Sequence, residues 1–247
     1  MKAEPHKIKT IKNLNILSIY QREVELREAG FNTFNIGSDK VTYDMISQGT
    51  SAKSQEQESG SLIGDETYAG SRNFEKLTHA VNDTFGHKYV CPVHNLQGAL
   101  KLITTTMVGN EGEVLANTHL PELIVKNENG QFISLAPSSD PVYTGNVDLH
   151  ELKTLLQEDL NISYVFIDVF ADGFKPVSIL HLKEIKTLTE KHQVKLIFNI
   201  SYVSELATFL QENDAELYYK SVAELVYQIT SIADVCVLDA SQGPRCN

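Results

Sequence analysis

Between residues 89 and 238, short apolar runs alternate with longer segments in which apolar residues recur every three or four positions. The short runs are typical of buried strands, and the longer segments are typical of amphipathic helices. This alternation predicts an α/β fold with a mainly parallel sheet covered by helices on both faces. The expected strands are Tyr89–Val93, Glu113–Asn117, Gln131–Leu135, Ser163–Val169, Val194–Asn199 and Asp234–Leu238, and the expected helices span residues 95–107, 148–158, 178–191, 203–212 and 221–232.

The last of these helices has the clearest start. Ser221 and Glu224 have the spacing of a capping box, in which each side chain pairs with the other residue's backbone N–H. An apolar stripe at helical spacing follows, and it consists of Val222, Leu225, Val226, Ile229 and Ile232. Asp148 and Glu151 form a weaker signal of the same kind at the start of residues 148–158.

The part before residue 89 is less regular. Residues 1–17 lack a clear period and are interpreted as an N-terminal arm, with residues 18–247 forming one α/β domain. A charged helix is expected from Ser18 to Ala29, and the polar residues 47–61 are interpreted as a solvated loop. After Arg72, a further helix is expected with Phe74, Leu77, Val81 and Phe85 on one face, ending at Gly86.

Composition narrows the class of protein. The 247 residues are 42% hydrophobic and carry a formal charge of −11, which disfavours nucleic-acid and anionic-membrane partners. No apolar run approaches the roughly 20 residues that span a bilayer. Cys91, Cys236 and Cys246 form no disulfide pattern, which favours a reducing, cytoplasmic setting. The first two lie in expected strands and are predicted to be buried, whereas Cys246 is predicted to be exposed.

Several segments keep a common register with one enzyme family. They are Glu4-Pro5 with Ile8-Lys9, Glu28-Ala-Gly-Phe-Asn32, Gly64-Asp-Glu-Thr-Tyr-Ala-Gly-Ser-Arg72, Gly145-Asn-Val-Asp-Leu149, Pro176-Val-Ser178 and Ala233-Asp234. With them, the chain resembles the aromatic amino-acid β-eliminating lyases, the family of tryptophanase and tyrosine phenol-lyase, as a shortened homologue. The resemblance implies the large domain of a fold-type I enzyme that depends on pyridoxal phosphate.

The same resemblance implies where the cofactor pocket lies. The family's phosphate-cradling turn corresponds to His94-Asn-Leu-Gln-Gly-Ala-Leu100, in which Gly98 is kept but an arginine is replaced by Gln97. The ring that stacks on the cofactor corresponds to His119 or Leu120, and the alignment does not choose between them. The asparagine that contacts the cofactor's phenolic oxygen corresponds to Phe170.

The largest departures concern charge and covalent attachment. The aspartate that pairs with the pyridine nitrogen corresponds to Asn199, and a nearby arginine corresponds to Tyr202. The lysine that forms the Schiff base corresponds to Gln242, whose amide cannot replace an amine. Gln97, Gly98, Phe170, Asn199, Tyr202 and Gln242 are therefore interpreted as a vestigial pocket. No catalytic residue and no bound cofactor are expected.

Other candidate sites have weaker support. Glu66 matches a glutamate that helps to hold a monovalent cation in the family, and Tyr68 and Arg72 match catalytic or positioning residues there. The eight histidines show no metal-ligand spacing, and His181 and His192 are expected on or beside an exposed helix face. No Gly-x-Ser-x-Gly motif supports a hydrolase triad.

The departures in the pocket favour a pseudoenzyme that has lost pyridoxal phosphate binding and catalysis and acts through protein contacts or ligand binding. The alternative is a pyridoxal-phosphate lyase subunit that another chain completes, and a truncated, non-functional product also stays open. The kept interface-type motif at residues 64–72 favours a homo-oligomer or a complex with a related lyase. The strand edges of Tyr89–Val93 and Asp234–Leu238 are expected either to close up in a changed sheet order or to take a strand from a partner chain.

Overall fold

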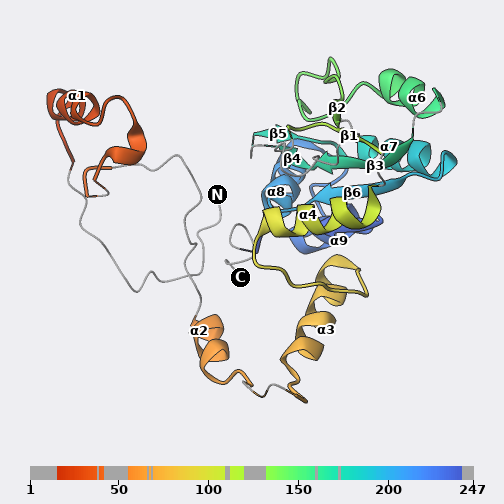
Figure 1. Ribbon diagram of the computed structural model, residues 1–247, viewed down its shortest axis with the longest axis horizontal. Helices are drawn as coiled ribbons and strands as arrows, with labels where there is room; N and C mark the ends of the chain where they lie inside the picture. Colours follow the sequence, from red (N-terminus) through yellow and green to blue (C-terminus); the bar gives the residue numbers. More distant parts are fainter. Residues whose placement is uncertain are drawn as a thin grey trace. The chain divides into compact units, whose positions relative to one another are not determined.

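The computed structural model in Figure 1 describes residues 16–37, 39–41, 55–65, 67, 69–108, 112–119, 132–158, 161–171 and 174–240. The chain divides into two compact units, Met1–Gly49 and Thr50–Asn247. The division into an arm of 17 residues and a single following domain stays a prediction.

In the first unit, α1 (Ile19–Glu28) is followed by the short 3-10 helix η1 (Thr33–Asn35). Ser18 caps α1 through the Gln21 backbone N–H, and the Gln21 side chain returns the bond to Ser18, so that both orphan donors are satisfied. The expected charged helix is confirmed. None of its described residues is buried within this unit.

The second unit contains the sheet. Its strands are β1 (Glu113–Ala116), β2 (Phe132–Ser134), β3 (Ile162–Asp168), β6 (Lys195–Asn199) and β7 (Val235–Val237), in the spatial order β2-β1-β3-β6-β7. All four pairings are parallel. The mainly parallel sheet expected from the sequence is therefore confirmed, with strand bounds within two residues of those predicted.

Helices connect the strands of the second unit. Their bounds are α2 (Gln55–Leu62), α3 (Asn73–Phe85), α4 (Leu96–Met107), α6 (Leu149–Gln157), α7 (Ile179–Lys191), α8 (Val203–Asn213) and α9 (Val222–Thr230). The Ser221 capping box and the left-handed Gly86 at the end of α3 are present as predicted.

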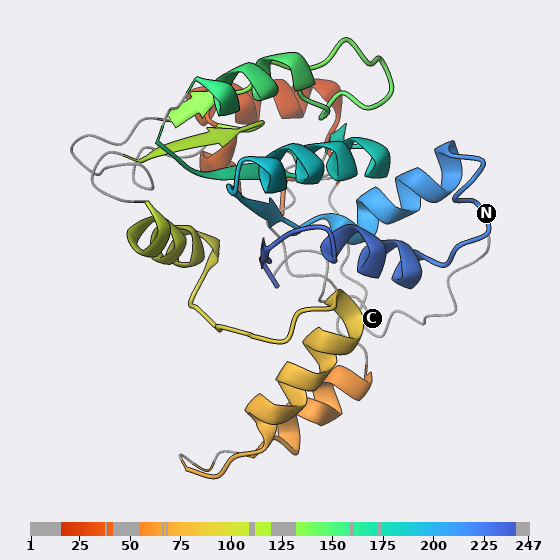
Figure 2. The ribbon, with the colours of Figure 1, turned by 90° about the vertical axis from the view of Figure 1, so that its right-hand side faces the viewer.

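The two faces of the sheet carry separate apolar cores, because successive strand residues point to opposite sides. One core joins strand residues such as Leu115, Val165 and Phe198 to α6, α7, α8 and α9. The other joins strand residues such as Tyr164, Phe166 and Ile197 to α4. Helices thus cover both faces, with α4 on one side and α6 to α9 on the other (Figures 1 and 2).

Three expectations about local structure are wrong: the strand at Tyr89–Val93, the burial of Cys91, and the loop over residues 55–61. Tyr89–Val93 forms no strand, Tyr89 is 85% exposed, and Cys91 is exposed, because no strand of the described residues pairs with this apolar run. Residues 55–61 of the expected loop belong to α2, in agreement with the helix propensity of their glutamines and glutamates. A short antiparallel hairpin of β4 (Phe170–Ala171) and β5 (Lys175–Pro176) directly follows β3 and was not expected.

Only one of the two expected strand edges is therefore present, and it belongs to β7 at the end of the sheet order. Cys236 in this strand is partly buried, and burial raises the pKa of its thiol to about 12. Within the ranges given above, no helix is long and apolar enough to cross a membrane.

Candidate functional site

The candidate site lies where β3 and β6 end. Asp168 and Asn199 are the last residues of these strands and are register partners in the parallel pairing. Carboxyl ends of parallel strands are the usual place for ligands in open α/β sheets. Counted by alternation from Phe166 and Ile197, both side chains belong to the face that α4 covers.

The amide of Asn199 is held on both sides. Its Nδ2 donates to Asp168 Oδ2 at 2.8 Å, and its Oδ1 accepts from the backbone N–H of Ser201 at 3.2 Å. The Ser201 hydroxyl also donates to Oδ1 at 2.7 Å, and it accepts the backbone N–H of Asp239 at 3.0 Å. These bonds link the ends of β6 and β7 through one small polar cluster.

Asn117 fixes the backbone of Asp168. Its Oδ1 accepts the Asp168 N–H at 2.8 Å, and its Nδ2 donates to the Asp168 carbonyl at 3.0 Å. The same Nδ2 donates to the Gly145 carbonyl at 3.2 Å. Asp168 Oδ1 accepts the Phe170 backbone N–H at 3.2 Å. The acid is therefore oriented from the end of β1 and from the beginning of β4.

The N-terminus of α4 belongs to the same edge, since a helix that precedes a parallel strand runs opposite to it. Asn95 caps this helix, and its Oδ1 accepts the Gly98 N–H at 2.8 Å. Gln97 and Gly98 lie in the first turn. A Cβ at Gly98 would lie 3.3 Å from Asn95 Oδ1, so the glycine keeps the cap uncrowded. A helix N-terminus favours an anion such as phosphate.

Two further residues of the expected pocket lie at this edge. Tyr202 stands at the N-cap position of α8, and burial, together with the negative Glu205, Asp168 and Asp239, raises the pKa of its phenol. Phe170 in β4 packs beside Phe209 of α8 with 6.4 Å between the ring centroids. Its side chain thus belongs to the apolar packing.

The remaining expected residues are more scattered. His119 is exposed and meets Phe132 edge-on, with 6.3 Å between the ring centroids. Arg72 is exposed just before α3 and makes no side-chain cap bond there. Glu66, Tyr68, Leu120, Cys246 and Gln242 lie outside the described residues. The cation candidate Glu66 and the lysine position therefore stay predictions.

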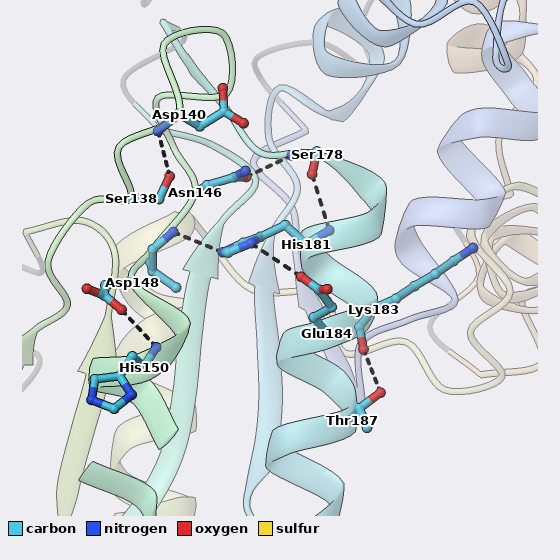
Figure 3. A network of polar contacts seen from close by, with 11 residues as sticks. Ser138, Asp140, Asn146, Asp148, His150, Ser178, His181, Lys183, Glu184 and Thr187 are labelled. Carbon is cyan, nitrogen blue, oxygen red and sulfur yellow. Dashed lines mark hydrogen bonds and ion pairs between the residues drawn. The ribbon is translucent and has the colours of Figure 1, made fainter. Parts of the chain in front are cut away.

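His181 is not on an exposed helix face, as expected, but is only 7% exposed (Figure 3). The backbone N–H of Val147 donates to its Nε2 at 3.0 Å, and Glu184 Oε2 lies 3.9 Å from its Nδ1. Because a backbone N–H can only donate, the imidazole is neutral. Burial lowers the pKa of His181, against a smaller opposite effect from Glu184 and Asp140. The segment before α6 covers the ring, which helical periodicity could not reveal.

The same segment is fixed to the N-terminus of α7. Asn146 Oδ1 accepts the Ser178 N–H at 3.0 Å, and the Ser178 hydroxyl accepts the His181 N–H at 3.2 Å (Figure 3). The Gly145 N–H donates to the Pro176 carbonyl at 3.0 Å. The bonds of Asn146 and Ser178 use side chains to satisfy backbone groups, as is typical of a structural network. In the portion of the chain that is described, no group of three His, Cys, Asp or Glu side chains could hold a metal ion.

Sequence reasoning missed Asp168, Asn117 and Ser201. A usable signal existed, because Asp168 is a charged residue at the carboxyl end of the apolar run Tyr164–Ile167. The ends of parallel strands lie at one edge, so polar residues there are candidates for a site. The pairing of Asp168 with a residue 31 positions away requires the strand order.

Known proteins match most of this chain. The model of the beta-eliminating lyase family matches residues 41–247. Tyrosine phenol-lyase of Pasteurella multocida is 34% identical over 97% of this chain and 55% of its own length. Tyrosine phenol-lyase of Clostridium tetani is 32% identical over 94% of this chain and 53% of its own length. The chain thus spans about half the length of these relatives.

One solved structure supports the fold alone. A chain in the crystal structure of the SepCysS–SepCysE N-terminal domain complex matches with a TM-score of 0.54 at 9% identity, over 82% of this chain and 54% of that chain. This agrees with the mainly parallel sheet and the helices on its two faces.

These comparisons correct one expectation. The departures in the pocket predicted that no cofactor is held, but the lyase family model and the tyrosine phenol-lyase relatives point to pyridoxal phosphate. Because the family model matches residues 41–247, which is most of the sequence, the chain belongs to the beta-eliminating lyase family.

Proposed function

We propose that this chain is a tyrosine phenol-lyase-like domain that holds pyridoxal phosphate without a covalent bond and does not complete the elimination reaction by itself. The observation that carries the proposal is the make-up of the edge formed by β3 and β6. It combines a carboxylate with a helix N-terminus on one face. The sequence resemblance, for its part, matches the family's Schiff-base lysine to Gln242.

The described residues fit a ligand with an anionic group and a protonated ring nitrogen. The first turn of α4, at Leu96 and Gln97, would receive the phosphate through the helix N-terminus, since the Gly98 N–H already donates to the Asn95 cap. Asp168 would face a positively charged ring nitrogen. When bound, pyridoxal phosphate supplies an electron sink for a carbanion.

Two lysines bear on covalent attachment. Lys195 starts β6 at the opposite end of the sheet, and its Nζ lies 3.8 Å from Asp234 Oδ1. It is therefore remote from the candidate site along the strand. Lys175 lies exposed in β5, which pairs with β4 directly after the end of β3. With Gln242 at the family position, we expect neither to bond to the cofactor.

The proposal is tested by adding pyridoxal phosphate to the purified chain. Equilibrium dialysis measures binding, borohydride reduction followed by mass spectrometry measures covalent attachment, and release of pyruvate and ammonia from tyrosine measures catalysis. We expect reversible binding, no mass increase after reduction, and no product. Gln242→Lys serves as the matched variant and should gain the mass increase.

Two outcomes would contradict the proposal. One is attachment to a lysine of the unaltered chain together with pyruvate release, which would identify an active lyase. The other is no detectable binding of pyridoxal phosphate. Assembly with a second copy or a related lyase, and a cytoplasmic location, stay predictions of the sequence that sizing and fractionation experiments would test.

A further inference from the structure

The acid at the candidate site stands one strand away from the position at which the sequence resemblance placed it. The family's aspartate corresponds to Asn199 on β6, and the carboxylate is instead Asp168 on β3. The two residues are register partners at the ends of neighbouring parallel strands. Their separation is therefore about one strand spacing, roughly 4.8 Å.

Both side chains lie on the same face of the sheet. Register partners in neighbouring strands project to the same side, and the 2.8 Å bond from Asn199 Nδ2 to Asp168 Oδ2 agrees with this. Strand alternation assigns that side to α4, whose first turn includes Gln97 and Gly98. The carboxylate and the helix N-terminus thus lie at one edge and on one face.

The bonds around Asn199 determine which of its atoms faces the acid. The Ser201 backbone N–H can only donate, so the side-chain atom that receives it is Oδ1. The amide group, Nδ2, must then point at Asp168. A donor in this position favours the ionised carboxylate, because an ionised carboxylate only accepts hydrogen bonds.

Asp168 is held in place by other elements as well. Phe170 donates its backbone N–H to Oδ1 at 3.2 Å, and Asn117 binds both the N–H and the carbonyl of the Asp168 backbone. An ionised carboxylate accepts hydrogen bonds at about four positions on its two oxygens. A rigidly held, ionised acid is suited to receive a charged N–H group of a ligand.

We propose that Asp168 performs the role for which Asn199 is unsuited: its carboxylate accepts the N–H of the protonated pyridine nitrogen of pyridoxal phosphate, and Asn199 orients that carboxylate. The negative charge of the pocket is displaced from β6 to β3 but keeps its face and edge. This inference rests on the proposed function, since it assigns a residue to the proposed cofactor site.

A charge exchange between the two strands tests the inference. Four proteins are compared: the unaltered chain, Asp168→Asn, the double variant Asp168→Asn with Asn199→Asp, and the control Asp83→Asn, which removes an exposed acid from α3. Dissociation constants for pyridoxal phosphate and for pyridoxine 5′-phosphate, which lacks the aldehyde, are measured by equilibrium dialysis. The second compound reports binding that needs no lysine.

We expect Asp168→Asn to weaken binding of both compounds at least about tenfold, as is typical for the loss of a charged hydrogen-bond partner. The double variant should regain most of the affinity, because it returns the acid to β6 with the hydrogen-bond donors exchanged. Asp83→Asn should bind as the unaltered chain does. Equal affinity in all four proteins would overturn the inference.

A spectroscopic measurement on the unaltered chain covers the case in which a variant fails to fold. The 15N chemical shift of ring-labelled pyridoxal phosphate reports protonation of the ring nitrogen. At a pH where the free cofactor has lost this proton, we expect the bound ring to keep it. A bound, unprotonated ring nitrogen would contradict the role of Asp168. Attachment to a lysine with a protonated ring would contradict the proposed function and leave this inference intact.

Discussion

Two polar networks lie next to each other at the carboxyl edge of the same sheet, and they use hydrogen bonds differently. The network of Gly145, Asn146, Val147, Ser178 and His181, here called the loop network, joins the segment before α6 to α7. The network of Asn117, Asp168, Asn199 and Ser201, here called the strand-end network, joins the ends of β1, β3 and β6.

The difference lies in what the side chains face. In the loop network, side chains satisfy backbone N–H groups in a region where Asn146 and His181 are buried. The strand-end network also satisfies backbone N–H groups, and its Asn199 and Ser201 are buried, but it adds a side-chain pair in which the Asn199 amide faces the carboxylate of the partly buried Asp168. We therefore expect substitutions in the loop network to cost stability and substitutions in the strand-end network to change ligand binding.

The largest effect is expected from Gly145→Ala in the loop network. A Cβ at this position would clash with the Lys175 carbonyl oxygen, which is backbone and cannot rotate away. We expect a loss of about 3 kcal/mol in the free energy of unfolding. Urea denaturation monitored by circular dichroism measures it.

The matched control is Gly60→Ala in α2, where an added Cβ meets nothing within 4 Å. It should raise the free energy of unfolding by about 0.5 kcal/mol, because alanine is the better helix former. Equal changes in the free energy of unfolding for the two substitutions would show that the backbone shifts to remove the clash at Gly145.

A smaller effect is expected from Asn146→Ala. Asn146 is 6% exposed, and its loss removes the acceptor of the Ser178 N–H at the start of α7. An unsatisfied, partly buried donor costs about 2 kcal/mol. The same urea titration measures this loss, and Asn213→Ala, at an exposed position of α8, provides the comparison. A smaller loss in the free energy of unfolding than that of Asn213→Ala would show that Asn146 does not stabilise the loop network.

The loop network should also make stability depend on pH through His181. Burial holds its pKa in the folded chain below the ordinary value of 6.5, so the unfolded chain takes up the proton first as the pH falls. The stability from neutral His181 is present above about pH 6.5 and is lost as the pH falls through the folded pKa. One proton contributes at most about 1.4 kcal/mol per pH unit.

His181→Gln should remove this part of the pH dependence, whereas His150→Gln, at an exposed position of α6, should keep it. Urea denaturation between about pH 5 and about pH 8 measures the difference. This range extends about one to two pH units on either side of the ordinary histidine pKa. If the free energy of unfolding changed with pH in the same way for the unaltered chain and for His181→Gln, His181 would not be the source of the pH dependence.

The smallest effect on stability is expected from Asp168→Asn in the strand-end network. An asparagine at this position can still accept the Asn199 amide through its oxygen, but its NH2 group cannot accept the Phe170 N–H. That one hydrogen bond is lost, and the free energy of unfolding falls by about 1 kcal/mol. Thermal and urea denaturation beside the binding measurement separate the two effects. A stability loss as large as that of Gly145→Ala would show that Asp168 serves mainly to stabilise the fold.

The sequence predicted the sheet well for a physical reason. The runs that form β1, β3, β6 and β7 are apolar and are bounded by capped helices such as α9. The hydrophobic pattern and the capping signals therefore predict the same elements. Tyr89–Val93 failed because an apolar run becomes a strand only where a partner strand is available.

The candidate site was predicted less well than the sheet. Motif alignment indicated Asn199, which ends β6, and Tyr202, which lies at the start of α8. It could not identify Asp168 as the neighbouring acid, since that contact depends on the register of β3 against β6. The helical pattern likewise assigned His181 to the surface, because the segment that buries it is 34 residues away.

The most direct measurement is a crystal structure of the unaltered chain grown with pyridoxal phosphate. We predict a cofactor that has no bond to any lysine. Its phosphate should lie at the first turn of α4, and its ring nitrogen should lie within hydrogen-bond distance of the Asp168 carboxylate. A cofactor bonded to Lys175, or a ring nitrogen that faces a group other than Asp168, would contradict it.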